Sequence, residues 1–439
     1  MKIAFATAFP RDPATPYGGV EAVSVNLVRA LAALPDLKLH VVTTDADCPR
    51  VQVRDWEGVK VHRLPRRAKR TLTHALGPGR RLVSEYVTAL APDVIHAHDV
   101  YGLMVKGLPF PRVFTVHGFI HGDTLVSGTR LAWLRARLWR RVETAGWADQ
   151  PHIISISPYV RERLAGLARG VIHDIDNPIA PEFFNIPRRE RKGRIFSAAL
   201  ICRRKNPLAL VEAVAQLAAA GQDVDLRLAG AISEPDYGAQ LRARVAQLGL
   251  TQRVQLLGSL GSTAVQDELA AASAFALVSL EEGSPMGIEE AMAAGVPVVT
   301  SNRCGMPYLV RDGESGFLVD PHNPGDIAAR LGELLANDAL RAKMGATSRR
   351  IALDRFHPDA VARRTREVYR RAACGASCGN GHAPAENRPA SDPLPLSGDA
   401  GAVQRPGQHA GLARVLGDHA VSQHARDNGA RTRPGARGG

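Results

Sequence analysis

Short apolar segments alternate with amphipathic segments along most of the chain. A short apolar run bounded by turn residues is typical of a buried strand, and apolar residues spaced by three and four are typical of a helix. In the first half the pattern predicts strands at 2–9, 37–44, 59–64, 93–98, 112–117, 152–156 and 171–176. In the second half it predicts strands at 195–200, 224–229, 254–258, 275–280, 297–301 and 316–319.

Helical patterns fill several of the gaps, at 20–34, 131–144, 207–220, 238–248, 339–353 and 357–371. Two Ser-Pro pairs, Ser157-Pro158 and Ser284-Pro285, predict further helix starts, because serine can cap free amides and proline fits the first helical position. Strand–helix alternation of this length predicts a parallel sheet covered by helices on both faces, and it occurs twice. The predicted fold class is α/β, with two doubly wound, Rossmann-like domains facing across a cleft.

A polar, charged segment interrupts the alternation and divides the chain. We place an N-terminal domain at 1–185, a linker at 186–193, a C-terminal domain at 194–355, a helix that could return to the N-terminal domain at 356–372 and a tail at 373–439. The tail has little apolar periodicity, so we expect it to be disordered. Its Cys374, Cys378 and His382 have loosely metal-like spacing but no fourth ligand, which argues against a zinc site.

Composition narrows the class of protein and its partners. The 439 residues leave room for two cores, and no unbroken apolar run is long enough to cross a bilayer. The apolar start is too short for a signal peptide, and five scattered cysteines suit a reducing compartment, so we expect a cytoplasmic protein. The formal charge of +13 favours an anionic partner, which could be nucleotide phosphate, an acidic membrane or nucleic acid.

The segment between the predicted strands 275–280 and 297–301 holds two carboxylates. Glu282 lies in a glycine-containing loop, and Glu290 lies in the second turn of the helix that follows. Ligands of such strand–helix–strand units bind at the carboxyl ends of the strands, where the helix amino end favours phosphate. Taken alone, the two glutamates would be interpreted as solvated surface acids, because glutamate is common. The surrounding pattern favours a binding site.

Several motifs follow one another in a recognisable order. Residues 17–21 read YGGVE, 92–98 read PDVIHAH, 115–118 read TVHG, 282–299 read EGSPMGIEEAMAAGVPVV and 305–319 read GMPYLVRDGESGFLV. In this order they resemble glycosyltransferase family 4, the retaining nucleotide-sugar transferases of GT-B fold. The resemblance covers about residues 1–372 and is densest from 254 to 326. It implies that the N-terminal domain faces the acceptor and that the C-terminal domain binds the nucleotide-sugar.

The resemblance also implies roles for individual residues. Glu282 and His117 are the catalytic candidates, because the matching residues of the family contact the donor sugar near the anomeric carbon. Glu290 is expected to bind the ribose hydroxyls, and Lys205 to neutralise the leaving diphosphate. The donor-binding candidates are Gly18, Gly19, Arg203, Arg204, Lys205, Gly283, Ser284, Pro285, Met286, Gly287 and Glu290.

Plainer interpretations of four of these residues stay open. Gly18 and Gly19 could form an ordinary turn, Lys205 could belong to a solvated charge run, and His117 could be a packed strand-end histidine. The chain also departs from the family pattern. Ala199 or Leu200 stands where relatives carry an arginine, and Tyr308 stands where many carry a glutamate. With Met286 and Gly287 in the sugar loop, the identity of the donor sugar does not carry over.

Two further features of the sequence could bind a membrane or a metal ion. The segment 130–141 pairs Leu and Trp with arginines at helical spacing, and Arg66, Arg67, Lys69 and Arg70 add positive charge. The segment either binds an anionic membrane surface peripherally, on its inner face, or packs on its own domain with a solvated basic face. His96, His98 and Asp99 could supply part of a metal site, but the set is incomplete, and the family resembled needs no metal.

The leading hypothesis is a cytoplasmic, retaining, metal-independent glycosyltransferase without a cofactor. It would move a sugar from a UDP- or GDP-sugar to a hydroxyl of a glycan, a glycolipid or a small molecule. A nucleotide-sugar epimerase on the same scaffold is the second hypothesis, and the pair of glutamates eight residues apart argues against it. A basic nucleic-acid-binding protein is the third, but the basic residues lack interleaved aromatics or a recognised binding motif, so we expect no nucleic acid.

Overall fold

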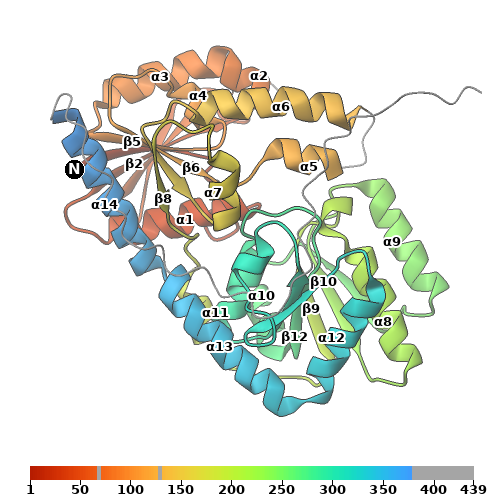
Figure 1. Cartoon of the computed structure of the whole chain (residues 1–439). Coiled ribbons are helices and arrows are strands. Elements are labelled where there is room, and N and C mark those ends of the chain that lie inside the picture. Colours follow the sequence, from red (N-terminus) through yellow and green to blue (C-terminus); the bar gives the residue numbers. More distant parts are fainter. Residues whose placement is uncertain (67–70, 127–130, 378–439) are drawn as a thin grey trace, which may run out of the picture. The chain divides into compact units, whose positions relative to one another are not determined.

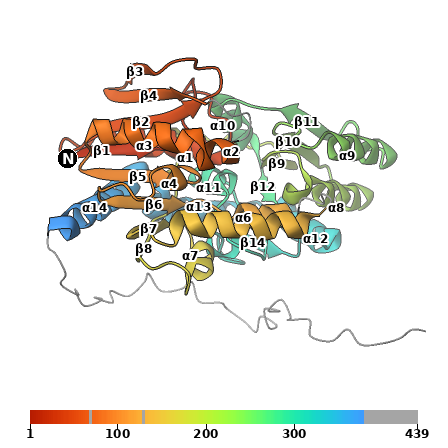
Figure 2. The ribbon, with the colours of Figure 1, turned by 90° about the horizontal axis from the view of Figure 1, so that it is seen from above.

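The computed structural model describes residues 1–66, 71–126 and 131–377, and its first part is an eight-stranded sheet (Figures 1 and 2). The strand order is β3-β4-β2-β1-β5-β6-β7-β8, which Figure 2 shows from one edge to the other. Neighbouring strands are parallel except for the antiparallel pair β3 and β4. The strands are β1 Lys2–Ala6, β2 Lys38–Asp45, β3 Gln52–Trp56, β4 Val59–Pro65, β5 Val94–His98, β6 Arg112–Val116, β7 His152–Ser155 and β8 Val171–Asp174.

The second part is a six-stranded sheet, parallel throughout, with the order β11-β10-β9-β12-β13-β14. Its strands are β9 Arg194–Ala198, β10 Asp225–Ala229, β11 Val254–Gly258, β12 Ala274–Leu277, β13 Val298–Ser301 and β14 Gly316–Val319. In chain order this is the 3-2-1-4-5-6 arrangement of a doubly wound sheet. The structure therefore confirms the predicted α/β class with two Rossmann-like sheets.

Helices accompany both sheets. In the first part they are α1 Gly19–Ala32, α2 Thr71–Leu76, α3 Pro78–Leu90, α4 Tyr101–Met104, α5 Ile120–Val126, α6 Ala132–Trp147, α7 Pro158–Leu164 and the 3₁₀ turn η1 Pro181–Asn185. In the second part they are η2 Arg203–Lys205, α8 Pro207–Ala219, α9 Pro235–Gln247, α10 Ser262–Ala271, α11 Met286–Ala293, η3 Met306–Tyr308, α12 Pro324–Ala336, α13 Asp338–Phe356 and α14 Pro358–Ser377.

Alternating strand residues build separate cores on the two faces of each sheet. In β1, Ile3 and Phe5 pack on one face with α1 and α14, whereas Ala4 and Ala6 pack on the other with α3, α4, α6 and α7. In the second sheet, α8, α9 and α12 cover one face, while α10, α11 and α13 cover the other. Burial of apolar side chains at about 25 cal/mol per Å² is the main force behind this layering.

Helix α14 comes last in the described chain, yet it packs on the first sheet (Figure 1). Val361, Val368 and Tyr369 are buried there, and the Tyr369 hydroxyl lies 2.7 Å from Nδ1 of His96. The helix continues to Ser377, so residues 373–377 of the predicted disordered tail are helical instead. The remainder of that tail, 378–439, lies outside the described residues. The predicted domain boundaries stay a prediction.

Every predicted strand overlaps an observed one, but strand β3 was missed. Its sequence, QVRDW, is mostly exposed and lacks a clear apolar alternation. Glu57 and Gly58, both with positive φ, turn the chain back into β4. Pairing with β4, rather than burial, holds β3 in place, and pairing is invisible to a local hydrophobic pattern.

The two Ser-Pro helix starts behave differently. Ser157 caps α7 as predicted, because its Oγ accepts from the Val160 N–H. The prediction for Ser284 is wrong: α11 begins at Met286 with Pro285 as its N-cap, and no side chain caps it. The Ser284 hydroxyl instead donates to the buried carboxyl group of Glu289.

Candidate active site

The topology of the second sheet brings two loops together. Strands β9 and β12 are neighbours, but the chain continues from them to opposite sides of the sheet, to β10 and to β13. At such a switch point the loops after the two strands diverge and leave a crevice for a ligand. The loop after β9 carries Arg203–Lys205, and the loop after β12 carries Glu281 and Glu282.

Two hydrogen bonds lock these loops to each other. The N–H of Leu280 donates to the Arg204 carbonyl over 2.8 Å. Asn206, with a φ of 54° that asparagine tolerates, donates through Nδ2 to the carbonyl of Val278 at the end of β12 and to that of Pro321. The basic and acidic loops thus have a fixed mutual position.

Glu282 lies between two cations. Its Oε1 is 2.6 Å from Nη1 of Arg204, and the same oxygen pairs with Nζ of Lys205. Arg204 also approaches Asp123 of α5, with 3.5 Å between Nε and Oδ1. Burial raises the pKa of Asp123 to about 6, against the lowering effect of Arg204. The cluster joins the basic and acidic loops of the second part to α5 of the first part.

The third basic residue of the loop points elsewhere. Nε of Arg203 is 3.7 Å from Oε2 of Glu234, and its guanidinium lies over the ring of Tyr237. The structure therefore brings Arg204 and Lys205 together with Glu282, but not Arg203.

The loop from Glu282 to Ser284 fits closely against its surroundings. The carbonyl of Glu282 accepts from the Gly305 N–H over 2.9 Å. A Cβ on Gly305 would lie 1.8 Å from the Gly283 carbonyl oxygen, so only glycine fits there. A Cβ on Gly283 would lie 2.9 Å from the carbonyl oxygen of His117, so β6 ends directly beside this loop.

Two adjacent glutamates of α11 have raised pKa values. Burial raises the pKa of Glu290, which lies half-buried in the second turn of the helix, to about 8. Burial raises the pKa of the fully buried Glu289 to about 8 as well, against the lowering effect of the Ser284 hydroxyl on Oε1. No partner for Oε2 of Glu289 is found among the described residues. The sequence motif singled out Glu290, and nothing in the pattern indicated that Glu289 is the buried neighbour.

The predicted glycines contribute to the site through close packing. Gly18 has a φ of 97°, and a Cβ on Gly19, the first residue of α1, would lie 3.9 Å from Sδ of Met286. The glycine loop after β1 therefore lies beside the start of α11. A Cβ on Gly287 would come within 2.9 Å of the Ala198 carbonyl oxygen, so Gly287 allows α11 to pack against the end of β9.

His117 follows β6 and lies at the edge of a buried hydrogen-bond network. Its Nε2 is 3.0 Å from Nδ1 of His98, which is 3.5 Å from the Ser24 hydroxyl. Burial lowers the pKa of His117 to about 4, so the ring is neutral at pH 7. A cavity of about 10 Å³, the size of a single water, borders His98, His117 and Asn177.

His96 is a satisfied core histidine. Its ring nitrogens are 2.7 Å from the hydroxyls of Tyr369 and Thr115, and burial lowers its pKa to about 3. Across residues 1–66, 71–126 and 131–377, no group of three or more His, Cys, Asp or Glu side chains is arranged to hold a metal ion.

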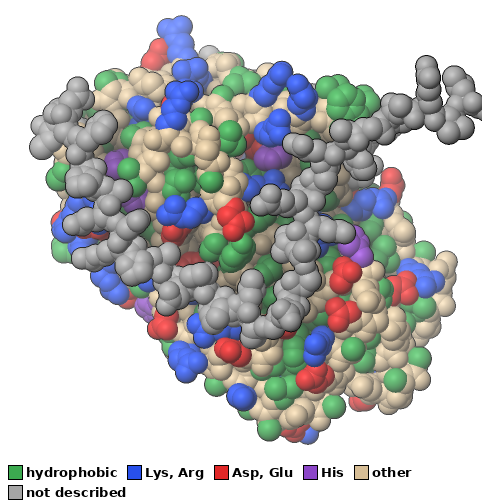
Figure 3. Space-filling view, in the orientation of Figure 1, with side chains coloured by type: hydrophobic (Ala, Val, Ile, Leu, Met, Phe, Trp, Pro, Cys, Tyr) green, Lys and Arg blue, Asp and Glu red, His purple; other side chains and the backbone are tan. Residues whose placement is uncertain are grey.

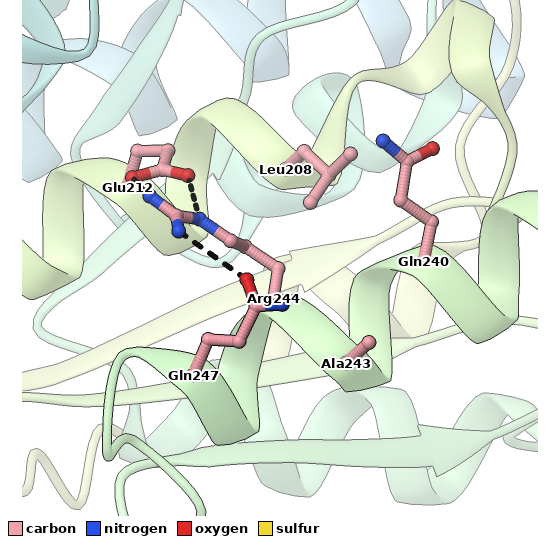
Figure 4. A pocket seen from close by; sticks show the side chains of 6 residues that line it. All are labelled: Leu208, Glu212, Gln240, Ala243, Arg244 and Gln247. Carbon is pink, nitrogen blue, oxygen red and sulfur yellow. Dashed lines mark hydrogen bonds and ion pairs between the residues drawn. The ribbon is translucent and has the colours of Figure 1, made fainter.

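A separate surface hollow of about 350 Å³ lies between α8 and α9 (Figure 4). Nε of Arg244 lies 2.5 Å from Oε1 of Glu212. Figure 4 shows the two side chains paired beside the hollow. None of the residues around it belongs to the predicted site. The hollow is therefore distinct from the switch point of the sheet.

Known protein families match both parts of this chain. The family model of group 1 glycosyl transferases matches residues 179–351, and that of glycosyltransferase family 4 matches residues 17–183. The D-inositol 3-phosphate glycosyltransferase of Nocardioides sp. is 33% identical over 81% of this chain and 85% of its own length. The chain belongs to glycosyltransferase family 4.

This family 4 glycosyltransferase is also similar to other proteins. The MMP alpha-(1->4)-mannosyltransferase of Mycolicibacterium hassiacum is 29% identical over 64% of this chain and 71% of its own length. Among solved structures, sucrose-phosphate synthase from Thermosynechococcus elongatus has a TM-score of 0.72, with 22% identity over 84% of this chain and 98% of its own. HepE from Anabaena, in complex with UDP-glucose, has a TM-score of 0.66, with 19% identity over 84% of this chain and all of its own. These likenesses show the GT-B fold.

Proposed function

We propose that this glycosyltransferase moves a sugar from a UDP- or GDP-sugar to an acceptor hydroxyl, with retention and without a metal. The observation that carries the proposal is the pairing of Lys205 and Arg204 with Glu282 at the switch point of the second sheet. Two cations at this point suit a diphosphate, and the adjacent carboxylate suits sugar hydroxyls. The UDP-glucose bound to HepE supports a nucleotide-sugar donor.

In the proposed reaction the protein supplies position and charge. Lys205 and Arg204 leave Glu282 and neutralise the charge that grows on the departing diphosphate. Glu282 holds the donor sugar, and Glu290 holds the ribose. The acceptor oxygen bonds to the anomeric carbon on the face from which the diphosphate leaves, and the departing phosphate oxygen takes the acceptor proton. Retention follows from this same-face attack, with the acceptor held in place.

A donor screen tests the proposal. UDP-, GDP- and ADP-linked sugars are offered to the wild-type protein, and thermal shift and release of the nucleoside diphosphate are measured. We expect one base to stabilise the protein and its sugar to be slowly hydrolysed. Replacing Glu290 by alanine should weaken binding of that nucleotide at least tenfold, because the ribose hydroxyls lose their acceptor.

The exposed Glu333, which pairs with Arg330, offers a matched control. Its alanine variant should bind the nucleotide like wild type. Equal affinity in the Glu290→Ala and wild-type proteins would contradict the site assignment. Conversion of the donor into a stereoisomer, rather than its hydrolysis, would favour the epimerase.

We also propose that helix α6 rests on an anionic membrane surface. Its side chains Trp133, Leu134 and Leu138 are strongly exposed, Trp133 by 64%, as is Leu131 directly before the helix. Arg137, Arg140 and Arg141 are exposed on the same helix. Figure 3 shows basic and hydrophobic side chains next to one another over α6. Apolar side chains with arginines suit the boundary between acidic headgroups and acyl chains. No helix in the described part of the chain is long and apolar enough to span a bilayer.

Vesicle sedimentation tests the membrane proposal. We expect the wild-type protein to bind phosphatidylglycerol vesicles and not phosphatidylcholine vesicles. Trp133→Glu should lower this binding at least tenfold and leave donor hydrolysis unchanged. Leu353→Glu, at another exposed apolar position on α13, is the control and should bind normally. Equal binding to both kinds of vesicle, or a dimer that Trp133→Glu dissolves, would contradict the proposal.

A further inference from the structure

Helix α7 of the first part contacts the loop that carries Glu282. Ser157, the N-cap of α7, donates from Oγ to the Gly283 carbonyl over 2.8 Å, while its own Oγ accepts from the Val160 N–H. Ser157 is buried, so this hydrogen bond is shielded from water. The helix cap and the loop are therefore fixed to each other by one hydroxyl group.

A second contact of α7 involves the carboxylate of Glu281. The Tyr159 hydroxyl donates to Oε1 of Glu281, and the Arg163 guanidinium lies 3.8 Å from the same oxygen and over the Tyr159 ring. Burial raises the pKa of Tyr159, so its hydroxyl keeps the proton that it donates. Oε2 of Glu281 accepts from Sγ of Cys304 over 3.1 Å. Both carboxylate oxygens therefore have partners in the free protein.

The main chain of Glu281 is held by a separate contact. Its carbonyl accepts from Nη1 of Arg204 over 2.9 Å, and Arg204 also pairs with Glu282. There is little free space around the carboxylate, because a Cβ on Gly122 would lie 3.1 Å from Oε1. Glu281, the residue that precedes the catalytic candidate Glu282, thus ties α7 directly to the loop.

We propose that Glu281 is a positioning residue, and that Ser157, Tyr159 and Arg163, the α7 clamp, hold loop 281–284 so that Glu282 meets the donor sugar. The inference rests on the proposed function for the role of Glu282. The clamp bonds to the Glu281 carboxylate and the Gly283 carbonyl, whereas Arg204 and Lys205 pair with the Glu282 carboxylate, so the clamp and a diphosphate use different groups. A displacement of about 1 Å at a reacting centre can cost about 100-fold in rate. The clamp therefore acts on turnover more than on nucleotide affinity.

The chain offers a matched pair of tyrosines for the test. Tyr308 also bonds to α7, with 2.8 Å between its hydroxyl and Oε1 of Glu162, and among the described residues this hydroxyl has no hydrogen bond to loop 281–284. Tyr159→Phe and Tyr308→Phe each remove one hydroxyl between α7 and the second part of the chain. Amide hydrogen exchange of residues 280–286 is measured in both variants. For both variants, kcat and KM are also measured with the UDP- or GDP-sugar that the donor screen identifies.

We expect Tyr159→Phe to speed exchange in this segment at least fivefold, to lower kcat about tenfold and to change the donor KM less than twofold. Tyr308→Phe should match wild type within twofold in exchange rate, kcat and donor KM. Glu281→Gln, which keeps an acceptor for Tyr159, should retain most of the kcat that Glu281→Ala loses. Unchanged exchange and kcat in Tyr159→Phe, or equal losses in both tyrosine variants, would overturn the clamp. A wild-type protein that binds no nucleotide would refute the proposed function, while the exchange data would still decide on the clamp.

Discussion

Replacing Lys205 by methionine is expected to lower kcat/KM for the donor by about 100-fold or more. Charge develops on the diphosphate oxygens as the bond to the sugar breaks, and removal of one preorganised stabilising group typically costs 100- to 1,000-fold in rate. Methionine keeps much of the length of the side chain and removes its charge. Affinity for the nucleoside diphosphate should fall more than affinity for the nucleoside, because Lys205 is assigned to the phosphates. Steady-state kinetics and calorimetric titration measure both effects.

Arg203 provides the control, since it belongs to the same charge run but pairs with Glu234 and lies over Tyr237. Arg203→Met should stay within threefold of wild type in kcat/KM. Equal losses in the two variants would mean that general positive charge, rather than the position of Lys205, supports the reaction. Full activity in Lys205→Met would remove this residue from the site.

The free energy of unfolding is expected to depend on pH through Glu289. Burial raises the pKa of Glu289 to about 8, whereas the ordinary pKa of a glutamate, expected in the unfolded chain, is 4.5. The native state therefore keeps a proton that the unfolded state has lost. The stabilisation is fully present below pH 4.5 and is lost as the pH rises to about 8, with a slope of up to about 1.4 kcal/mol per pH unit.

The variant Glu289→Gln cannot titrate but keeps an oxygen for the Ser284 hydroxyl. The slope of unfolding free energy against pH should therefore be less steep in Glu289→Gln than in wild type, by about 1.4 kcal/mol per pH unit between pH 5.5 and 7.5. Urea unfolding at four pH values measures it. Glu290 and the buried histidines titrate in both proteins, so their effects cancel in the difference. Glu333→Gln should follow wild type, and parallel slopes for wild type and Glu289→Gln would contradict the buried, protonated state.

The sequence alone determined the features that depend on neighbouring residues. Apolar runs located every described strand except β3, because a buried strand needs apolar side chains wherever it lies in the fold. Gly295, with a φ of 69°, follows α11, where a left-handed residue after a helix favours glycine. The order of the motifs identified the family, which the comparisons confirm.

Only the tertiary structure decided which side chains meet. Lys205 and Glu282 are far apart in the sequence and pair because β9 and β12 are neighbours at a switch point. Arg203 belongs to the same charge run but pairs with Glu234 instead. The loop that holds Glu282 is fixed by α7 through Glu281, a residue that no motif marked. Hydrophobic period and turn chemistry act over a few residues, whereas the partners of a polar side chain depend on strand order and packing, which no local pattern contains.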